Sequence, residues 1–214
     1  MSEIESIFPI IKVCGMKDRK NMQEVLEANP NWMGFIFFED SPRHCSSDVY
    51  EVIRSIDGAT KVGVFVNADA KEVIERATAC ELDIVQLHGE ETPEVCAKIQ
   101  EHFPIMKAIS IQNVDDLEKT KNYEDCVDYF LFDTKDKQKR GGTGKQFDWN
   151  ILQSYSGQVP FLLSGGISQN DVQHLLSVDH EQCIGFDVNS CFETQPGMKD
   201  ANMLNEFISK MKEA

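Results

Sequence analysis

Short apolar runs rich in valine, isoleucine and phenylalanine recur along the chain, separated by polar segments with helical spacing. The segments at residues 70–79 and 93–102 predict amphipathic helices with Asp69 and Thr92 as N-caps, and Asp200 is the expected cap of the last helix. The apolar runs predict eight strands, at residues 9–15, 33–38, 61–66, 83–88, 104–109, 128–133, 160–165 and 183–188. Strands that alternate with helices indicate a parallel sheet, because parallel neighbours need crossover connections.

The alternation favours a closed (β/α)8 barrel, although an open doubly wound sheet uses the same succession of elements. Composition does not change part way along the 214 residues, so we expect a single barrel domain over residues 1–214. In both architectures the active residues lie at the carboxyl ends of the strands. Those positions are rich in polar and glycine residues: Cys14–Gly15, Ser41–Arg43, Asn67, His88–Gly89, Asp133–Thr134, Ser164–Gly166, Asp187 and Asn189–Ser190.

Charge and cysteine content narrow the classes of partner. The formal net charge is −15, from 21 Lys and Arg against 36 Asp and Glu, so we expect neither nucleic acid nor an anionic membrane as a partner. The seven cysteines contain no C-x-x-C pair, which favours reduced thiols over disulfides or structural zinc. The acidic N-terminus is unlike a signal peptide. These features predict a cytoplasmic protein, and any anionic substrate would need a locally arranged site.

The first strand ends in a thiol. Strand residues alternate in direction, so either Lys12 and Cys14 face inward or Ile11 and Val13 do. Cys14 could act as a base or nucleophile if a neighbouring charge lowered its pKa. A free cysteine is also commonly a small buried hydrophobic residue, and on this residue alone that interpretation is favoured.

Asp133 ends the sixth apolar run, just before a cationic tract. Partial burial there could keep the carboxyl protonated so that it donates a proton. An N-cap, or an ion pair with Lys135 or Lys137, explains the position equally well. His88 at another strand end is more typical of a hydrogen-bonded core residue, and no histidine spacing indicates a metal.

Two turns are candidates for binding a phosphate. The S-G-G segment at residues 164–166 and the D-V-N-S segment at residues 187–190 both follow strands, at the position where barrels often bind phosphate. The cluster GGTGK at residues 141–145 fails the P-loop pattern, because Lys139 stands at its first glycine position and Gln146 follows the lysine. Arg43 is a charged fork suited to a carboxylate or phosphate, although most such arginines are solvated.

Several strings, in order along residues 10–212, resemble phosphoribosylanthranilate isomerases of tryptophan biosynthesis. They are KVCGMK, GFIFFEDSPRHCS, VGVFVN, VQLHG, DT followed by GGTGKQFDW, LLSGG and FDVNSCFETQPGMKD. The resemblance implies a (β/α)8 barrel that carries out an Amadori rearrangement of a phosphosugar substrate, N-(5-phosphoribosyl)anthranilate, without metal or organic cofactor.

The resemblance also implies residue roles. Cys14 would be the general base, Asp133 the general acid, and Arg43 the partner of the anthranilate carboxylate. Backbone groups of the two turns would hold the phosphate, and Asp187 could also orient a sugar hydroxyl. The phosphate residues are Gly165, Gly166, Asp187 and Asn189. The chain departs from the family pattern at Asn189 and Cys191, where serine and glycine are usual, and at residues 44–45, where tyrosine and valine are usual.

Two other functions fit parts of the pattern. The ProFAR isomerase of histidine biosynthesis performs the same rearrangement, but it would require an aspartate in place of Cys14 and a second phosphate site. A barrel that binds phosphate without catalysis would not need both Cys14 and Asp133. We further expect a monomer, in which residues 135–140 form a solvated tract and residues 141–145 a lid that closes over the substrate.

Overall fold

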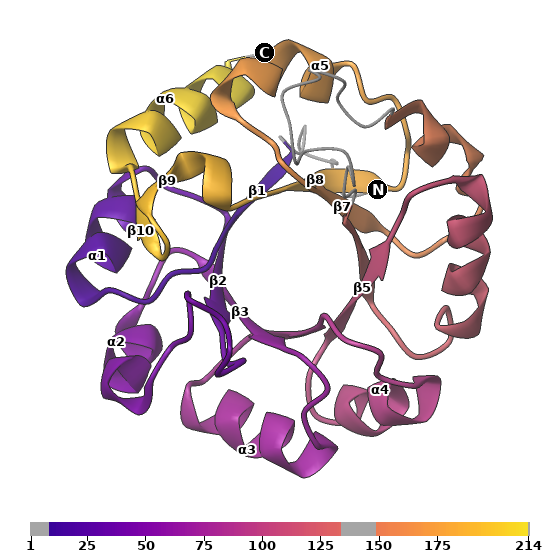
Figure 1. The fold of residues 1–214 in the computed structure, drawn as a ribbon, viewed down its shortest axis with the longest axis horizontal. Helices are drawn as coiled ribbons and strands as arrows, with labels where there is room; N and C mark the ends of the chain where they lie inside the picture. The colour runs from indigo at the N-terminus through magenta and orange to yellow at the C-terminus, as the bar shows by residue number, and fades with distance from the viewer. Residues whose placement is uncertain (1–8, 134–148, 214) are drawn as a thin grey trace, which may run out of the picture.

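Eight parallel strands form a closed barrel in the order β1 to β8, with β8 paired to β1 (Figure 1). The computed structural model describes residues 9–133 and 149–213. The strands are β1 (Ile10–Cys14), β2 (Trp32–Ile36), β3 (Thr60–Phe65), β4 (Ile84–Leu87), β5 (Ile105–Ser110), β6 (Tyr129–Asp133), β7 (Phe161–Ser164) and β8 (Cys183–Val188). Each strand overlaps one predicted run, and closure excludes the doubly wound sheet. The predicted (β/α)8 barrel is therefore confirmed.

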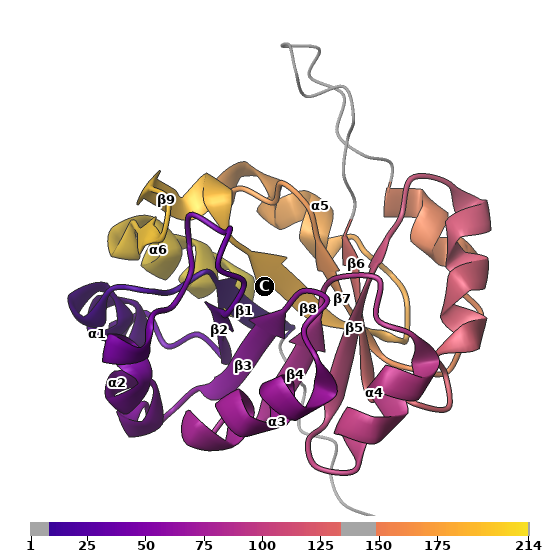
Figure 2. The same ribbon diagram turned by 60° about the horizontal axis from the view of Figure 1, so that its bottom comes forward.

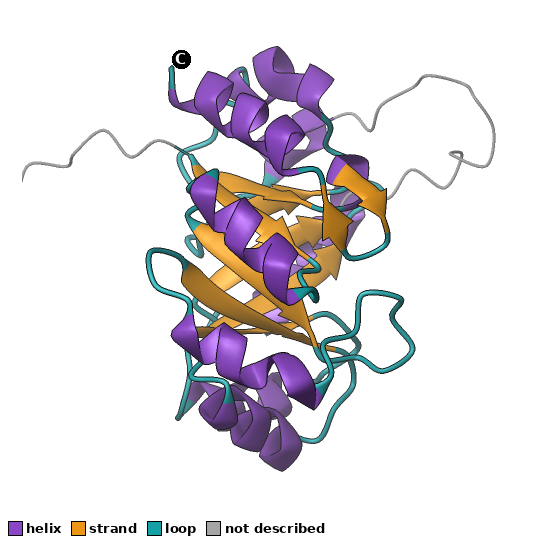
Figure 3. Cartoon of the chain, turned by 90° about the vertical axis from the view of Figure 1, so that its left-hand side faces the viewer, coloured by secondary structure: helices purple, strands orange, loops and turns teal. Residues whose placement is uncertain are grey.

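Helices surround the strands, and Figure 3 shows them on both sides of the sheet; in Figure 2, α3 and α4 cover β3 to β5 from outside. The α-helices are α1 (Arg19–Glu27), α2 (Tyr50–Ser55), α3 (Ala70–Ala79), α4 (Pro93–Gln100), α5 (Val172–Leu176) and α6 (Ala201–Lys212). The 3₁₀ helices are η1 (Ser47–Val49), η2 (Val114–Asn122), η3 (Trp149–Ser154), η4 (Gln169–Asp171) and η5 (Ser190–Phe192). A small hairpin of β9 (Glu193–Gln195) and β10 (Met198–Lys199) follows β8.

Two of the three predicted N-caps form the expected hydrogen bond. Asp69 accepts from the N–H of Lys71 at 2.8 Å, and Asp200 accepts from Met203 at 3.0 Å. Thr92 occupies the N-cap position of α4, but its side chain makes no capping hydrogen bond. A proline at the start of α4 already fixes φ there, so the helix begins at the predicted residue without that bond.

Alternation along the strands separates an inner core from an outer one. Leu131 packs inside the barrel with other apolar residues, whereas Phe130 and Phe132 belong to the larger core between strands and helices. In β1, Ile10 packs against the inner cluster, while Ile11 and Val13 are in the outer core. The side chains of residues 12 and 14, which alternate with these outer residues, therefore face the barrel interior.

None of the helices in the described ranges combines the length and apolar character needed to cross a membrane. The predicted lid at residues 141–145 and the tract at residues 135–140 lie outside the described residues. Lys135 and Lys137, the alternative partners of Asp133, lie in that tract.

Candidate active site

A row of polar side chains crosses four neighbouring strands near their carboxyl ends. In the register of the sheet, Asp133 pairs with Ser164, Ser164 with Asp187, and Asp187 with Lys12. Neighbours in register point to the same face, so the row faces the barrel interior. Cys14 lies two residues beyond Lys12 on the same face of β1. The structure thus brings both predicted catalytic residues to one end of the barrel.

Lys12 is the charged neighbour that the reactivity of Cys14 requires. Its side chain is fully buried, and its Nζ lies 2.9 Å from Oδ1 of Asp187. Burial lowers the pKa of Lys12, but the charges of Asp187 and of the Cys14 thiolate outweigh that effect and raise it. Lys12 therefore stays cationic inside the barrel. Sequence reasoning left its direction open, because strands of a parallel sheet are apolar on both faces and show no alternation.

Cys14 is itself buried, with 4% of its surface exposed. Burial raises the pKa of the thiol, Lys12 lowers it, Asp187 raises it and Lys199 lowers it, and the net result lies above the ordinary value. The thiol is thus protonated at neutral pH. Lys12 is the strongest of the groups that favour the thiolate, so the base depends on this cation.

Asp133 faces a histidine that sequence reasoning assigned to the core. Nε2 of His88 lies 3.6 Å from Oδ2 of Asp133, within ion-pair range but beyond hydrogen-bond range. Nδ1 of His88 lies 2.8 Å from Nε2 of Gln86, on the same strand. His88 is partly exposed, whereas Asp133 is buried at 7%. The candidate acid is therefore buried beside an imidazole.

Arg43 is held by a carboxylate that the sequence did not indicate. Its Nε donates to Oε1 of Glu193 at 2.8 Å, and its Nη2 donates to Oε2 at 2.6 Å. Oε1 of Glu193 also accepts from Nζ of Lys199 at 2.7 Å and from the N–H of Gly197 at 3.0 Å. Glu193 and Lys199 lie on the hairpin after β8, and no local motif marks them as site residues.

The close approach of Arg43 to β1 depends on Gly15. A Cβ on Gly15 would lie 2.7 Å from Cδ of Arg43 and 2.9 Å from Oδ1 of Asn189. The residue also has φ +83°, a conformation that favours glycine. Gly15 therefore lets the arginine and the asparagine meet next to Cys14.

Replacing Gly15 with alanine is expected to lower stability by roughly 2–3 kcal/mol, because backbone strain adds to the clash with Arg43 and Asn189. Gly58 offers a matched control, since it has φ +86° and nothing within 4 Å of an added Cβ. Gly58→Ala should cost only the strain, about 1–2 kcal/mol. Urea denaturation of both variants measures the difference, and equal losses would show that the clash at Gly15 is absent.

The two predicted phosphate turns lie side by side. Ser164 and Asp187 are in register, so Gly165–Gly166 and Asn189 extend from adjacent strand ends. Both glycines have positive φ, 112° and 66°. In the described part of the chain, the N–H groups of Gly165, Gly166 and Asn189 make no hydrogen bond. Unused amides on adjacent turns are suited to an anion.

Other polar groups near these turns already make hydrogen bonds within the protein. The helix after Gly166 starts with a capping box, in which Oδ2 of Asp171 accepts from the N–H of Ser168 at 2.7 Å. Its N-terminus is therefore less available to a phosphate than the glycine amides. Sγ of Cys191, one of the residues that depart from the family pattern, lies 3.5 Å from the carbonyl oxygen of Gly166. This contact joins the two turns.

The Arg43–Glu193–Lys199 group makes stability depend on acid pH. Burial raises the pKa of Glu193, but its hydrogen bonds to Arg43 and Lys199 lower it from 4.5 to about 2. A depressed carboxyl pKa adds stability that is complete above the unfolded value and is lost as the pH falls towards the folded value.

Between about pH 6 and about pH 3.5, Glu193 should account for a loss of about 1.4 kcal/mol in the free energy of unfolding. Glu193→Gln has no such group and should lose correspondingly less over this range. Urea titrations of both proteins at the two pH values give the comparison. Equal losses would mean that the pKa of Glu193 is not depressed.

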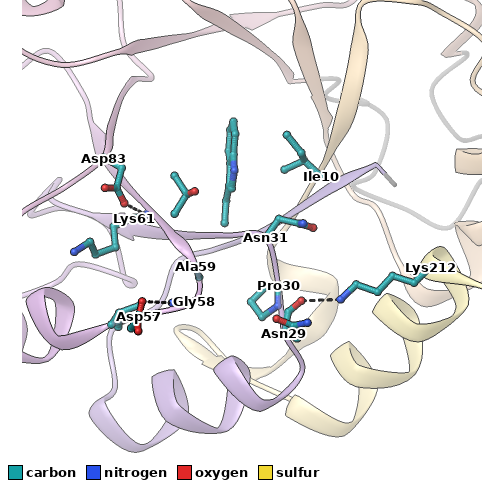
Figure 4. A pocket seen from close by; sticks show the side chains of 13 residues that line it. Ile10, Asn29, Pro30, Asn31, Asp57, Gly58, Ala59, Lys61, Asp83 and Lys212 are labelled. Carbon is teal, nitrogen blue, oxygen red and sulfur yellow. Dashed lines mark hydrogen bonds between the residues drawn. The ribbon is translucent and has the colours of Figure 1, made fainter. Parts of the chain in front are cut away.

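A hollow of about 580 Å³ lies at the other end of the barrel (Figure 4). It is lined by the first residues of β1 to β3, with Asp57, Asp83 and Lys212 around it. This is the amino end of the strands, away from Cys14 and Asp133, so the hollow does not belong to the candidate site. In the described ranges, no three His, Cys, Asp or Glu side chains are arranged to hold a metal ion.

Comparison with known proteins agrees with this arrangement. Residues 11–210 match the family model of N-(5'phosphoribosyl)anthranilate (PRA) isomerase. The N-(5'-phosphoribosyl)anthranilate isomerase of Parabacteroides distasonis is 44% identical over 206 residues, covering 94% of this chain and 93% of its own. That of Phocaeicola vulgatus is 42% identical over 205 residues, covering 95% and 98%.

Solved structures give the same result. The phosphoribosyl anthranilate isomerase of Thermotoga maritima superposes with a TM-score of 0.83 at 31% identity, covering 95% of this chain and 98% of its own. A phosphoribosyl anthranilate isomerase in complex with reduced 1-(o-carboxyphenylamino)-1-deoxyribulose 5-phosphate also gives 0.83, at 30% identity and the same coverage. This chain belongs to the N-(5'-phosphoribosyl)anthranilate isomerase family.

Proposed function

We propose that this chain isomerises N-(5'-phosphoribosyl)anthranilate with Asp133 as general acid and Cys14 as general base. Family membership makes it an aldose–ketose isomerase of tryptophan biosynthesis. The observation that carries the residue roles is the continuous row from Asp133 through Asp187 to Lys12, which ends beside Cys14. An acid and a base at one strand-end surface are what a proton-transfer isomerisation requires.

The first step opens the sugar. Asp133, in its protonated form, donates its proton to the furanose ring oxygen. The C1–O bond breaks, and the nitrogen lone pair forms a Schiff base with C1. His88 lies against the carboxyl group and limits its exposure to water. Burial favours the neutral form of a carboxyl group, which is the form that this step requires.

The second step moves the double bond. The thiolate form of Cys14, a minor fraction that Lys12 favours, removes the proton from C2 of the Schiff base, and the electron pair passes to nitrogen to give an enolamine. The enolamine then tautomerises to the 1-deoxyribulose product. Lys12 stabilises the thiolate and is itself held by Asp187 at 2.9 Å. Lys12 thus positions charge for the reaction without touching the substrate.

The protein has a net charge of −15, which repels an anionic substrate. Substrate binding therefore relies on groups arranged locally in the site. Arg43 pairs with the anthranilate carboxylate through the part of its guanidinium that Glu193 leaves unused. The amides of Gly165, Gly166 and Asn189 bind the phosphate. Asp187 orients a sugar hydroxyl through Oδ2, because Oδ1 is engaged by Lys12.

Turnover is the direct test of this function. Purified protein mixed with freshly made N-(5'-phosphoribosyl)anthranilate should cause loss of the anthranilate-type fluorescence as product forms. Circular dichroism on the same sample establishes that the protein is folded. A folded protein without turnover would exclude the proposal, and turnover of the histidine-pathway substrate alone would favour the ProFAR isomerase.

Arg43→Ala should chiefly weaken substrate binding. Loss of a charged hydrogen bond to the carboxylate is expected to raise KM by roughly 10–100-fold while kcat changes little. Steady-state kinetics over a wide substrate range separates the two constants. A fall in kcat at constant KM would show that Arg43 does not act by binding the carboxylate.

We further infer a single-domain enzyme that works as a cytoplasmic monomer with a phosphosugar substrate and no cofactor. The closed barrel supports the monomer, because pairing of β8 with β1 leaves no free edge among its eight strands. The Thermotoga maritima isomerase is described as dimeric, so the state of this chain needs its own measurement. Light scattering of the purified protein provides it, and a dimer mass would reject the monomer.

A further inference from the structure

Glu193 makes several contacts that the proposed mechanism does not use. It is a carboxylate with 4% side-chain exposure on β9, and it accepts hydrogen bonds from Arg43, Lys199 and the N–H of Gly197. A buried carboxylate with two cationic partners restricts both of them, because a partner that left would lose a charge-assisted hydrogen bond. The chemistry of the reaction gives no other reason for this residue.

The contact with Glu193 fixes the plane of the Arg43 guanidinium. A bidentate pair through Nε and Nη2 leaves the arginine one orientation, and its Cδ passes close to Gly15, where an added Cβ would clash with it. In the described ranges Nη1 makes no hydrogen bond. The side chain is 20% exposed, so part of it is open to solvent.

Lys199 connects this pair to the predicted phosphate turn. Its side chain is fully buried, and its Nζ donates to Oδ1 of Asn189 at 2.7 Å as well as to Glu193. The backbone of Lys199 is bound to α1, because Asn21 accepts from its N–H at 2.7 Å and donates to its carbonyl oxygen at 2.8 Å. The hairpin is thus anchored to a helix at the point where it holds both partners.

We propose that Glu193 is a positioning residue that orients Arg43 towards the substrate carboxylate, so that the β9–β10 hairpin determines selectivity for substrates that carry this group. The inference rests on the proposed pairing of Arg43 with the carboxylate. Glu193 keeps its contact with Arg43 while substrate is bound, since Lys199 and Gly197 hold it in place. A carboxylate ligand therefore meets a guanidinium that is already oriented, and binding does not have to restrict its rotamers.

The most informative variant is Glu193→Asp. It preserves the negative charge, so the field around the site stays the same, but its shorter side chain cannot reach both Arg43 and Lys199. Glu193→Gln is a second variant, in which an NH2 donor replaces one of the two acceptor oxygens of the carboxylate. Thr194→Ala is the control on the same hairpin, because Thr194 is exposed and its hydroxyl donates to the carbonyl oxygen of Met198, away from Arg43 and Lys199.

Binding of two ligands distinguishes a positioning role of Glu193 from a general role in the structure of the site. One is the reduced product analogue, reduced 1-(o-carboxyphenylamino)-1-deoxyribulose 5-phosphate, and the other is its phenylamino counterpart without the carboxylate. Glu193→Asp should bind the first roughly 10-fold more weakly and the second about as wild type does. Thr194→Ala should bind both unchanged, and adding Glu193→Asp to Arg43→Ala should cause no further loss. Glu193→Gln should show the same selectivity and serves if the aspartate variant does not fold.

The outcomes are distinct. Unchanged binding of both ligands by Glu193→Asp, or equal weakening of both, would overturn the positioning role. If Arg43→Ala itself failed to discriminate between the ligands, the proposed carboxylate pairing would be wrong and this inference would fall with it. Discrimination by Arg43→Ala but not by either Glu193 variant would leave the proposed function intact and reject only the role of Glu193.

Discussion

Asp133→Asn is expected to lower kcat by roughly 10²–10⁴-fold, the usual cost of losing a positioned acid. The amide has nearly the same shape as the carboxyl group, so it should preserve packing in a pocket where Asp133 is 7% exposed. It cannot transfer a proton to the ring oxygen, and ring opening would then depend on water. Binding contacts elsewhere are unchanged, so KM should move much less than kcat.

Progress curves of the wild type and of Asp133→Asn at saturating substrate give the two kcat values. Asp83→Asn is a matched control, because Oδ2 of Asp83 only accepts from the N–H of Lys61 at the amino end of the barrel. That variant should turn over at the wild-type rate. A kcat for Asp133→Asn within a few-fold of wild type would remove Asp133 from the role of acid.

The fold was largely predictable because each strand of the barrel is a short apolar run between polar segments. Residues 128–133 and 183–188 illustrate this, since they coincide with β6 and β8 to within one residue. The helical connections were harder to predict. Between β5 and β6 and between β6 and β7 the described segments form 3₁₀ helices, η2 and η3, whose polar sequences show the same short-range turn signals as an α-helix.

The site was predictable where function depends on position along a strand. Cys14, Asp133 and Asp187 end or nearly end their strands, and parallel order brings those ends together. Partners from opposite parts of the chain carry no such signal. Lys12 and Asp187 are 175 residues apart, and Arg43 and Glu193 are 150 apart, so their contacts exist only in the closed barrel.

Lys12→Met should cause the second large effect, a loss of about 3–5 kcal/mol in stability together with a large fall in kcat. Without the ammonium, the carboxylate of Asp187 is buried and unpaired. Lys12 is the strongest of the groups that lower the pKa of Cys14, so its removal raises that pKa further. Each unit of that rise reduces the thiolate fraction about tenfold at fixed pH.

Lys107→Met is the control for Lys12→Met. It distinguishes the effect of losing any buried cation from the effect of losing the cation near Cys14. Lys107 is equally buried and lies 3.1 Å from Oε2 of Glu91, but it faces the outer side of β5. Both variants should be destabilised in urea. Only Lys12→Met should shift the thiolate absorbance of Cys14 to higher pH, measured as the difference from the same protein carrying Cys14→Ser. If that titration were unchanged in Lys12→Met, the cation would serve folding alone and another group would have to stabilise the thiolate.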